Sequence, residues 1–226
     1  MKGRRVLKWL RGSTTADVLL AGASLAPLVV LLVRQVLQLD NPTVPCCDFA
    51  ALELGTRAFL RGEQFLGLYS REGWRHPGPA PFAWDSLFRP LPGHSFAEHQ
   101  VAAACLALVA LAGVIVCLWR RVSPIGRSLT LVLIAVFIAR FGVNAFAVPW
   151  NPYAAALWSL LAVCAVSTYA VGRTRPALVT AIIAASMAAQ THVGAAPTAA
   201  VCAVTIGVTI IRHRRSRWST SHGVIA

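Results

Sequence analysis

Long uninterrupted apolar blocks constrain the fold of this 226-residue chain more than any other feature. A helix needs about 20 apolar residues to cross the hydrocarbon core of a bilayer. The blocks show no alternation with a period of two, so they do not fit a membrane β-barrel. The sequence therefore predicts an all-α, polytopic bundle of transmembrane helices. The blocks run over Val18–Leu39, Val101–Trp119, Ser128–Val148, Ala154–Val171 and the longer stretch Ala177–Ile211.

The last block contains a polar break at Gln190-Thr191-His192-Val193-Gly194, followed by Pro197. We interpret the block as two short spans joined by a tight outer turn, which gives about six spans in all. A single tilted helix with a kink is the alternative, because membrane helices tolerate proline when their neighbours satisfy the freed backbone groups.

The composition agrees with a membrane location. Hydrophobic residues make up 57% of the chain, charged residues only 13%, and the mean hydropathy is +0.63. Soluble domains carry about 25% charged residues. A disordered chain is excluded, and a soluble globular domain does not account for the apolar blocks.

The basic residues predict the orientation. Lys and Arg gather in the N-terminal segment, in the loops after the second and fourth spans, and in the tail. Because cytoplasmic segments carry an excess of Lys and Arg, we expect a multi-pass plasma-membrane protein with a cytoplasmic N-terminus. The net charge of +13 is then a topology signal that also favours anionic lipid headgroups, and we expect no nucleic-acid partner.

This orientation divides a single membrane domain, residues 1–226, into parts. The first block lacks a small-residue cleavage site and is expected to remain as an anchor. The parts are a cytoplasmic basic segment (1–17), the first span (18–39), an extracytoplasmic loop (40–99), the remaining spans (100–211) and a cytoplasmic basic tail (212–226).

The extracytoplasmic loop is the one long polar segment, and long loops outside the membrane are often functional. It holds most of the carboxylates of the chain, namely Asp40, Asp48, Glu53, Glu63, Glu72, Asp85 and Glu98.

Residues 48–61 within this loop have the spacing of a short amphipathic helix. Phe49, Leu52 and Phe59 fall near one face, and Glu53 and Arg57 form a favourable i,i+4 pair on another. We expect this helix to lie on the outer membrane surface with its apolar face down. Asp48 at its start is either an N-cap or a functional carboxylate.

The segment 69–79, YSREGWRHPGP, contains the Pro and Gly of a rigid, turned loop. Arg71, Arg75 and His76 could converge on a phosphate, and Tyr69 and Trp74 could stack on a sugar. A loop of interfacial aromatic residues with solvated arginines is the alternative interpretation.

These residues resemble a known family. A first span, an outer loop with Asp48, Glu53 and Arg57, and the segment 69–79 are similar to the N-terminal part of actinobacterial polytopic glycosyltransferases of the GT-C type. WNPY at 150–153 and QTHVG at 190–194 are also similar to that group. The predicted topology places all of these segments on one side of the membrane.

The resemblance implies an enzyme that transfers a sugar from a polyprenyl-phosphate donor to an acceptor on the outer face. Asp48 would be the catalytic base, which the acceptor hydroxyl needs. The charge of the leaving phosphate would be met by cationic side chains or by a divalent cation, Mg²⁺ or Mn²⁺, held partly by Asp48. The implied binding residues are Glu53, Arg57, Tyr69, Arg71, Trp74, Arg75, His76, Gln190 and His192.

Members of the family usually continue with further spans, whereas this chain ends after its basic tail. The resemblance therefore implies a truncated or frameshifted form, or one half of an enzyme that a second polypeptide completes. Two other functions stay open. One is a non-catalytic multi-pass membrane protein, either a degenerate relative or an assembly partner. The other is a transporter, which would usually carry polar groups at mid-membrane.

Overall fold

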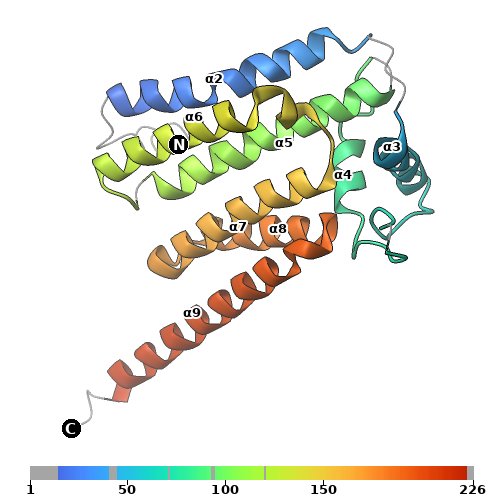
Figure 1. Cartoon of the computed structure of the whole chain (residues 1–226). Helices are drawn as coiled ribbons and strands as arrows, with labels where there is room; N and C mark the ends of the chain where they lie inside the picture. Colours follow the sequence, from blue (N-terminus) through green and yellow to red (C-terminus); the bar gives the residue numbers. More distant parts are fainter. Residues whose placement is uncertain (1–14, 41–44, 71, 93–94, 120, 223–226) are drawn as a thin grey trace.

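The protein is an all-α bundle (Figure 1). The computed structural model describes residues 15–40, 45–70, 72–92, 95–119 and 121–222. Its long helices are α2 (Thr15–Leu37), α5 (Ser95–Leu118), α6 (Pro124–Phe141), α7 (Asn151–Gly172), α8 (Arg175–Thr191) and α9 (Ala196–His222).

Five helices of the described chain are long and apolar enough to cross a membrane, which confirms a multi-pass helical protein. The sixth, α8, has 17 residues. At 1.5 Å per residue it is about 26 Å long, close to the lower limit for a span. A sixth span therefore stays a prediction. The five candidate spans are Thr15–Leu37, Phe96–Leu118, Pro124–Phe141, Asn151–Gly172 and Val193–His213.

The polar break in the last apolar block separates two helices, as predicted, and does not kink a single one. Helix α8 ends at Thr191, the short 3-10 helix η2 spans Val193–Ala195, and α9 begins at Ala196. The His192 ring closes this turn, since its Nδ1 accepts a hydrogen bond from the Gly194 N–H at 3.0 Å.

The third apolar block is divided in a way that the sequence analysis did not predict. Helix α6 ends at Phe141, and Gly142 follows with a φ of +89°. This conformation suits glycine and ends the helix, so residues 143–147 form the 3-10 helix η1 instead of the end of a span.

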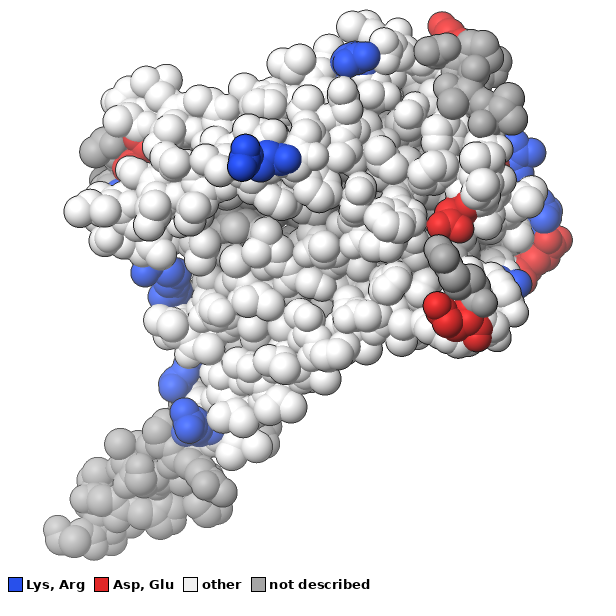
Figure 2. Space-filling view, viewed as in Figure 1, with Lys and Arg blue, Asp and Glu red and all other residues white. Residues whose placement is uncertain are grey.

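Two short helices, α3 (Cys47–Leu60) and α4 (Ala80–Ser86), lie together with η1 and η2 at one end of the bundle, which we call the loop end (Figure 1, right). The connections between α5 and α6 and between α7 and α8 lie at the opposite end. Figure 2 shows acidic side chains concentrated at the loop end on the visible face, with basic side chains at both ends and also on the face between them.

Small residues let the central helices approach closely. Ala162 and Ala165 of α7 and Ala181, Ala184 and Ala188 of α8 are fully buried. By contrast, α2, α6 and α9 expose many Val, Leu and Ile side chains, for example Val30, Leu133 and Val204. Burying such surface in hydrocarbon is favourable, which agrees with a bundle surrounded by lipid.

The predicted amphipathic helix exists as α3, but the prediction that its apolar face lies on the outer membrane surface is wrong. Leu52 packs with Leu68 and Phe82, and the Phe49 ring lies 5.5 Å from that of Phe96. This face is therefore covered by protein and does not lie on the membrane. The N-cap prediction for Asp48 is also wrong, because the N-cap is Cys46 and Asp48 lies in the first turn.

Candidate functional site

An apolar cavity of about 350 Å³ lies between α4, α5, η1, α7 and α8, near the loop end. Aromatic side chains form much of its wall. Trp84 and Trp158 meet edge to face with ring centroids 5.8 Å apart, and Phe146, Trp150 and Tyr153 also line the space. Its size falls within the range of small-molecule binding pockets.

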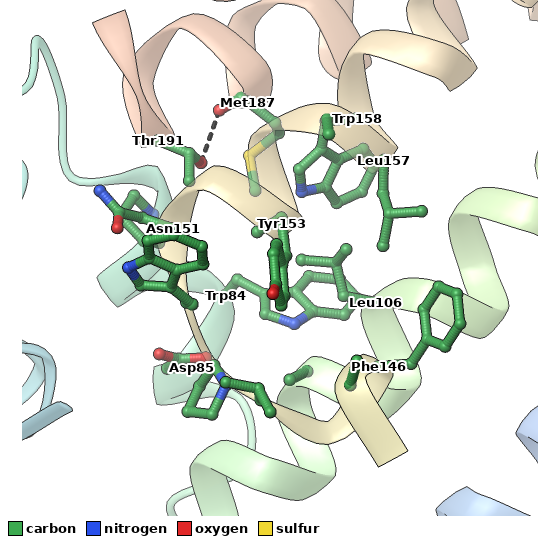
Figure 3. A pocket seen from close by; sticks show the side chains of 18 of the residues that line it. Trp84, Asp85, Leu106, Phe146, Asn151, Tyr153, Leu157, Trp158, Met187 and Thr191 are labelled. Atoms are coloured by element: carbon green, nitrogen blue, oxygen red, sulfur yellow. Dashed lines mark hydrogen bonds between the residues drawn. The ribbon is translucent and has the colours of Figure 1, made fainter. Parts of the chain in front are cut away.

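Three of the polar residues that line the cavity lie on one side of it (Figure 3). Figure 3 shows Asp85, Asn151 and Thr191 together on one side, with Leu106, Phe146 and Leu157 opposite them. Such a division suits an amphiphile, whose polar group would lie against the first side and whose apolar part would lie against the second.

Behind Asp85 lies a buried ionisable network. The His99 ring is 1% exposed and lies between two carboxylates, with Nε2 2.6 Å from Glu53 Oε2 and Nδ1 3.1 Å from Asp85 Oδ2. The second contact lacks hydrogen-bond geometry, since His99 Nδ1 has no hydrogen-bond partner among the described residues.

Arginines complete the network. Arg89 contacts Glu53 at 3.1 Å and Glu98 at 2.8 Å, and Arg57 pairs with Glu53 as predicted from their i,i+4 spacing. Buried charges are tolerated where they are paired in this way. The network therefore joins α3, α4 and α5 through residues that are distant in the sequence.

The two carboxylates beside His99 differ in their pKa. Burial alone would raise the pKa of Glu53, but the hydrogen bonds from His99 and Arg57 and the charge of Arg89 lower it below its ordinary value. Burial raises the pKa of Asp85, and His99 offsets only part of this effect. Asp85 is thus the member of the pair that holds a proton more readily.

A second polar cluster forms around His76. Its Nδ1 accepts from the Val193 N–H at 3.3 Å, and its Nε2 lies 3.0 Å from the side-chain amide nitrogen of Asn151. The ring of His192 is centred 4.8 Å away and that of Trp74 5.3 Å away. Burial and the charge of His192 lower the pKa of His76 below its ordinary value.

The turned loop that carries His76 folds back on itself as predicted. The backbones of Tyr69 and Arg75 form an antiparallel bridge, and Gly73 has a φ of +87° at the turn. Gly78 lies so close to Gln190 that a Cβ atom would collide with the Gln190 side chain. The segments 73–79, 150–153 and 190–194 therefore meet in space, and Asn151 belongs both to this cluster and to the cavity wall.

The remaining predicted site residues lie around these two centres. Asp48 is exposed and does not line the cavity, and Tyr69 and Trp74 are also exposed. The Arg75 guanidinium lies over the Tyr69 ring, 5.8 Å from its centroid, so it does not converge with the buried His76 ring. Gln190 and His192 are half-buried. Arg71 lies outside the described residues.

The sequence analysis missed several residues of the site. Trp84, Asp85, Trp158, Glu98 and His99 were not named as site residues, although the cavity and the network depend on them. Glu98 and His99 directly precede an apolar block. Ionisable residues at the polar end of a span were the available signal.

The described residues contain no group of three or more His, Cys, Asp or Glu side chains that could hold a metal ion. The exposed Asp48 has no such cluster around it. A divalent cation therefore stays a prediction that depends on the resemblance.

No family model, curated protein or solved structure matches the chain. The fold defines a multi-pass helical membrane protein with five candidate spans among its described residues. Within this fold, a cavity with aromatic walls lies beside a buried ionisable network.

Proposed function

We propose that the protein is a membrane-embedded glycosyltransferase that moves a sugar from a polyprenyl-phosphate donor to an acceptor on the outer face of the plasma membrane. The observation that supports this function is the meeting of the segments 73–79, 150–153 and 190–194 at His76, beside the cavity. These segments carry the resemblance to GT-C enzymes, and 117 positions separate His76 from Val193.

In this function the cavity accepts the apolar part of a substrate, and the His76 cluster lies near the leaving phosphate. The half-buried His192 supplies positive charge or hydrogen bonds there. A neutral His76 provides hydrogen bonds at neutral pH, because its pKa is lowered by burial and by the charge of His192.

Transfer of labelled sugar from polyprenyl-phosphate donors tests the proposal with the purified full chain in nanodiscs. We expect transfer by the natural protein and a marked loss in His76→Gln, which disturbs the contacts with Asn151 and Val193. His213→Gln is the matched control, because His213 pairs with Arg173 in a part of the chain remote from the cavity. Absence of transfer from a panel of mannosyl, glucosyl and arabinosyl donors would refute the proposal.

The proposed orientation has its own test. Cys46 and Cys47 are exposed at the loop end, whereas Cys105, Cys117, Cys164 and Cys202 lie in apolar helices and are less exposed. A membrane-impermeant maleimide should therefore label Cys46 and Cys47 in intact cells. Labelling only after the cells are opened would reverse the orientation and place the cavity near the cytoplasm.

The exposure of Asp48 favours a second candidate, a non-catalytic membrane protein that assembles with another polypeptide. This candidate predicts no transfer by the chain alone and no loss of phenotype in His76 variants. If transfer appears only after a second envelope protein is added, the chain is one half of a split enzyme. It is then neither an enzyme that is active alone nor a non-catalytic protein.

A further inference from the structure

Asp85 differs from the other described residues of the cavity wall in its charge. Among the described residues that line the cavity, it alone carries a formal charge. It is 6% exposed and lies on the polar side with Asn151 and Thr191 (Figure 3). A ligand group next to Asp85 would therefore meet a carboxylate that is largely shielded from bulk water.

Trp158 supplies a second, independent indication of a ligand. Its ring lines the cavity and is 5% exposed, yet its indole N–H has no hydrogen-bond partner among the described residues. A buried donor without a partner is costly, and Trp N–H groups in buried positions usually find one. Trp84, which meets Trp158 edge to face, donates its own N–H to the Ala102 carbonyl at 2.9 Å. The unpaired donor of Trp158 points to an acceptor atom on a ligand.

The carboxylates of the network around Asp85 outnumber its arginines by one. Glu53, Asp85 and Glu98 contribute three negative charges, and Arg57 and Arg89 contribute two positive charges. A proton on His99, which lies between Glu53 and Asp85, cancels the remaining negative charge and leaves Asp85 ionised. These are the charged groups that α3, α4, α5 and the segment after α4 bring to the network.

We propose that the cavity binds an acceptor alcohol with an apolar body, whose oxygen atoms accept from Trp158 and whose hydroxyl donates to Asp85, the base of the transfer reaction. This inference rests on the proposed function. Hydroxyl groups fit because they both donate and accept hydrogen bonds, whereas a phosphate headgroup would be repelled by the Asp85 carboxylate. The apolar body matches the side formed by Leu106, Phe146 and Leu157.

The chemical step balances without another reactant. The acceptor oxygen forms a bond to the anomeric carbon of the donor sugar, and its proton passes to Asp85. The bond between that carbon and the phosphate oxygen breaks, and its electron pair leaves with the lipid phosphate. The proton then rests on Asp85, and His99 lies beside it, 3.1 Å from Asp85 and 2.6 Å from Glu53. His99 thus acts as a positioning residue.

Ligand binding tests the alcohol site without requiring transfer. The probes are 10-bromodecan-1-ol and 1-bromodecane, since bromine quenches the fluorescence of nearby tryptophans and both partition into lipid. We expect the alcohol to quench the full-length protein in nanodiscs at a concentration about five-fold lower than the alkane, in keeping with one extra hydrogen bond. Asp85→Leu and Trp158→Phe should remove this difference, and Glu63→Gln at the exposed Arg61–Glu63 pair should keep it. Equal quenching by the two probes would overturn the alcohol site.

Transfer kinetics test the role of Asp85 as the base. Asp85→Asn should lower kcat by about 10²- to 10⁴-fold while KM changes little, because general-base catalysis contributes an effect of this size. His99→Gln should mainly displace the pH profile of kcat, whereas a purely structural role would lower activity equally at every pH. A larger loss in Asp48→Asn than in Asp85→Asn would assign the base to Asp48 and contradict the inference.

The two experiments separate the possible failures. Transfer that survives in Asp85→Asn overturns this inference and leaves the proposed function intact. Absence of transfer in the natural protein overturns the proposed function and the role of Asp85 as a base, whereas the probes still decide whether Asp85 and Trp158 bind an alcohol. Thermal unfolding of each variant verifies that it is folded.

Discussion

The two ends of the bundle both bury charged side chains, but they do so in different surroundings. At the opposite end, Arg127 of α6 lies 3.0 Å from Asp17 of α2 and 5.6 Å from the centroid of the Trp119 ring. The space beside this pair amounts to about 10 Å³. At the loop end, a larger network borders a cavity of about 350 Å³.

This contrast separates a structural contact from a candidate site. The Asp17–Arg127 pair joins two helices and leaves room for no ligand, so its charges serve packing. The Glu53–His99–Asp85 network has one member on the wall of a cavity large enough for a substrate. Buried charge alone is therefore a weak sign of function, and buried charge next to an accessible cavity is a stronger one.

The largest expected effect tests the structural side of this contrast. Arg127→Ala removes the guanidinium from a buried ion pair, which typically costs about 3–5 kcal/mol of stability. We expect a large fall in melting temperature with unchanged transfer per folded molecule. Unfolding in nanodiscs and transfer on the folded fraction measure the two quantities. Arg121→Ala, at an exposed position near the same end, should change neither. A specific loss of transfer in Arg127→Ala would abolish the distinction between the ends.

Filling the cavity tests the functional side. Ala154→Phe places a ring at a position that lines the cavity. Because overpacking costs about 1–3 kcal/mol, we expect transfer and probe quenching to weaken by roughly 10-fold. Val171→Phe, at an exposed site on the same helix, is the matched control. If both variants behave alike, the cavity does not serve as the binding site.

A third prediction uses the pH dependence of stability. The raised pKa of the buried Asp85 makes the free energy of unfolding fall as pH rises from the ordinary value of 3.8 to the folded-state value. Above that range Asp85 is ionised in the folded state, and the loss of unfolding free energy has reached its full size. Asp85→Asn should therefore raise the melting temperature at pH 7.5 and have less effect at pH 4.

Glu53 should show the opposite sign within the same network. Burial raises its pKa, but the bonds from His99 and Arg57 and the charge of Arg89 lower it below the ordinary value of 4.5. Its stabilisation is present above 4.5 and is lost as pH falls through the folded-state pKa. Glu53→Gln should therefore destabilise the protein at pH 7.5. Melting curves that shift in the same direction for Asp85→Asn and Glu53→Gln would contradict this division.

Sequence patterns predicted the parts of the molecule that local interactions determine. The apolar blocks gave the long helices, the polar residues at 190–194 gave the break before α9, and i,i+4 spacing gave the pair of Glu53 and Arg57. These features depend on residues within one or two helical turns of each other. The end of α6 was misplaced, because the conformation of Gly142 leaves no mark on hydropathy.

The site depends on contacts between distant segments, and the sequence predicted only some of these contacts. The predicted topology placed the segments around His76 on one side of the membrane, and the structure brings them into contact. Nothing local couples Asp85, His99 and Glu53, since 46 positions separate Glu53 from His99. The acidic residue with the strongest resemblance, Asp48, lies on the surface, whereas the buried carboxylate was hidden in a segment that the family pattern does not cover.

The smallest expected effect concerns the outer edge of the network. The Arg57 side chain is 50% exposed, whereas that of Arg89 is 24% exposed and bridges Glu53 and Glu98. Exposed ion pairs contribute about 0.2–1 kcal/mol, because water screens the charges and the side chains lose freedom. Arg57→Ala should thus lower stability by less than Arg89→Ala and leave the difference between the bromo-alcohol and bromo-alkane probes unchanged. Comparison of the two melting temperatures in nanodiscs measures this. If Arg57→Ala were the more harmful variant, the network would depend on its surface edge, and the buried connection from Glu53 through His99 to Asp85 would lose its central position.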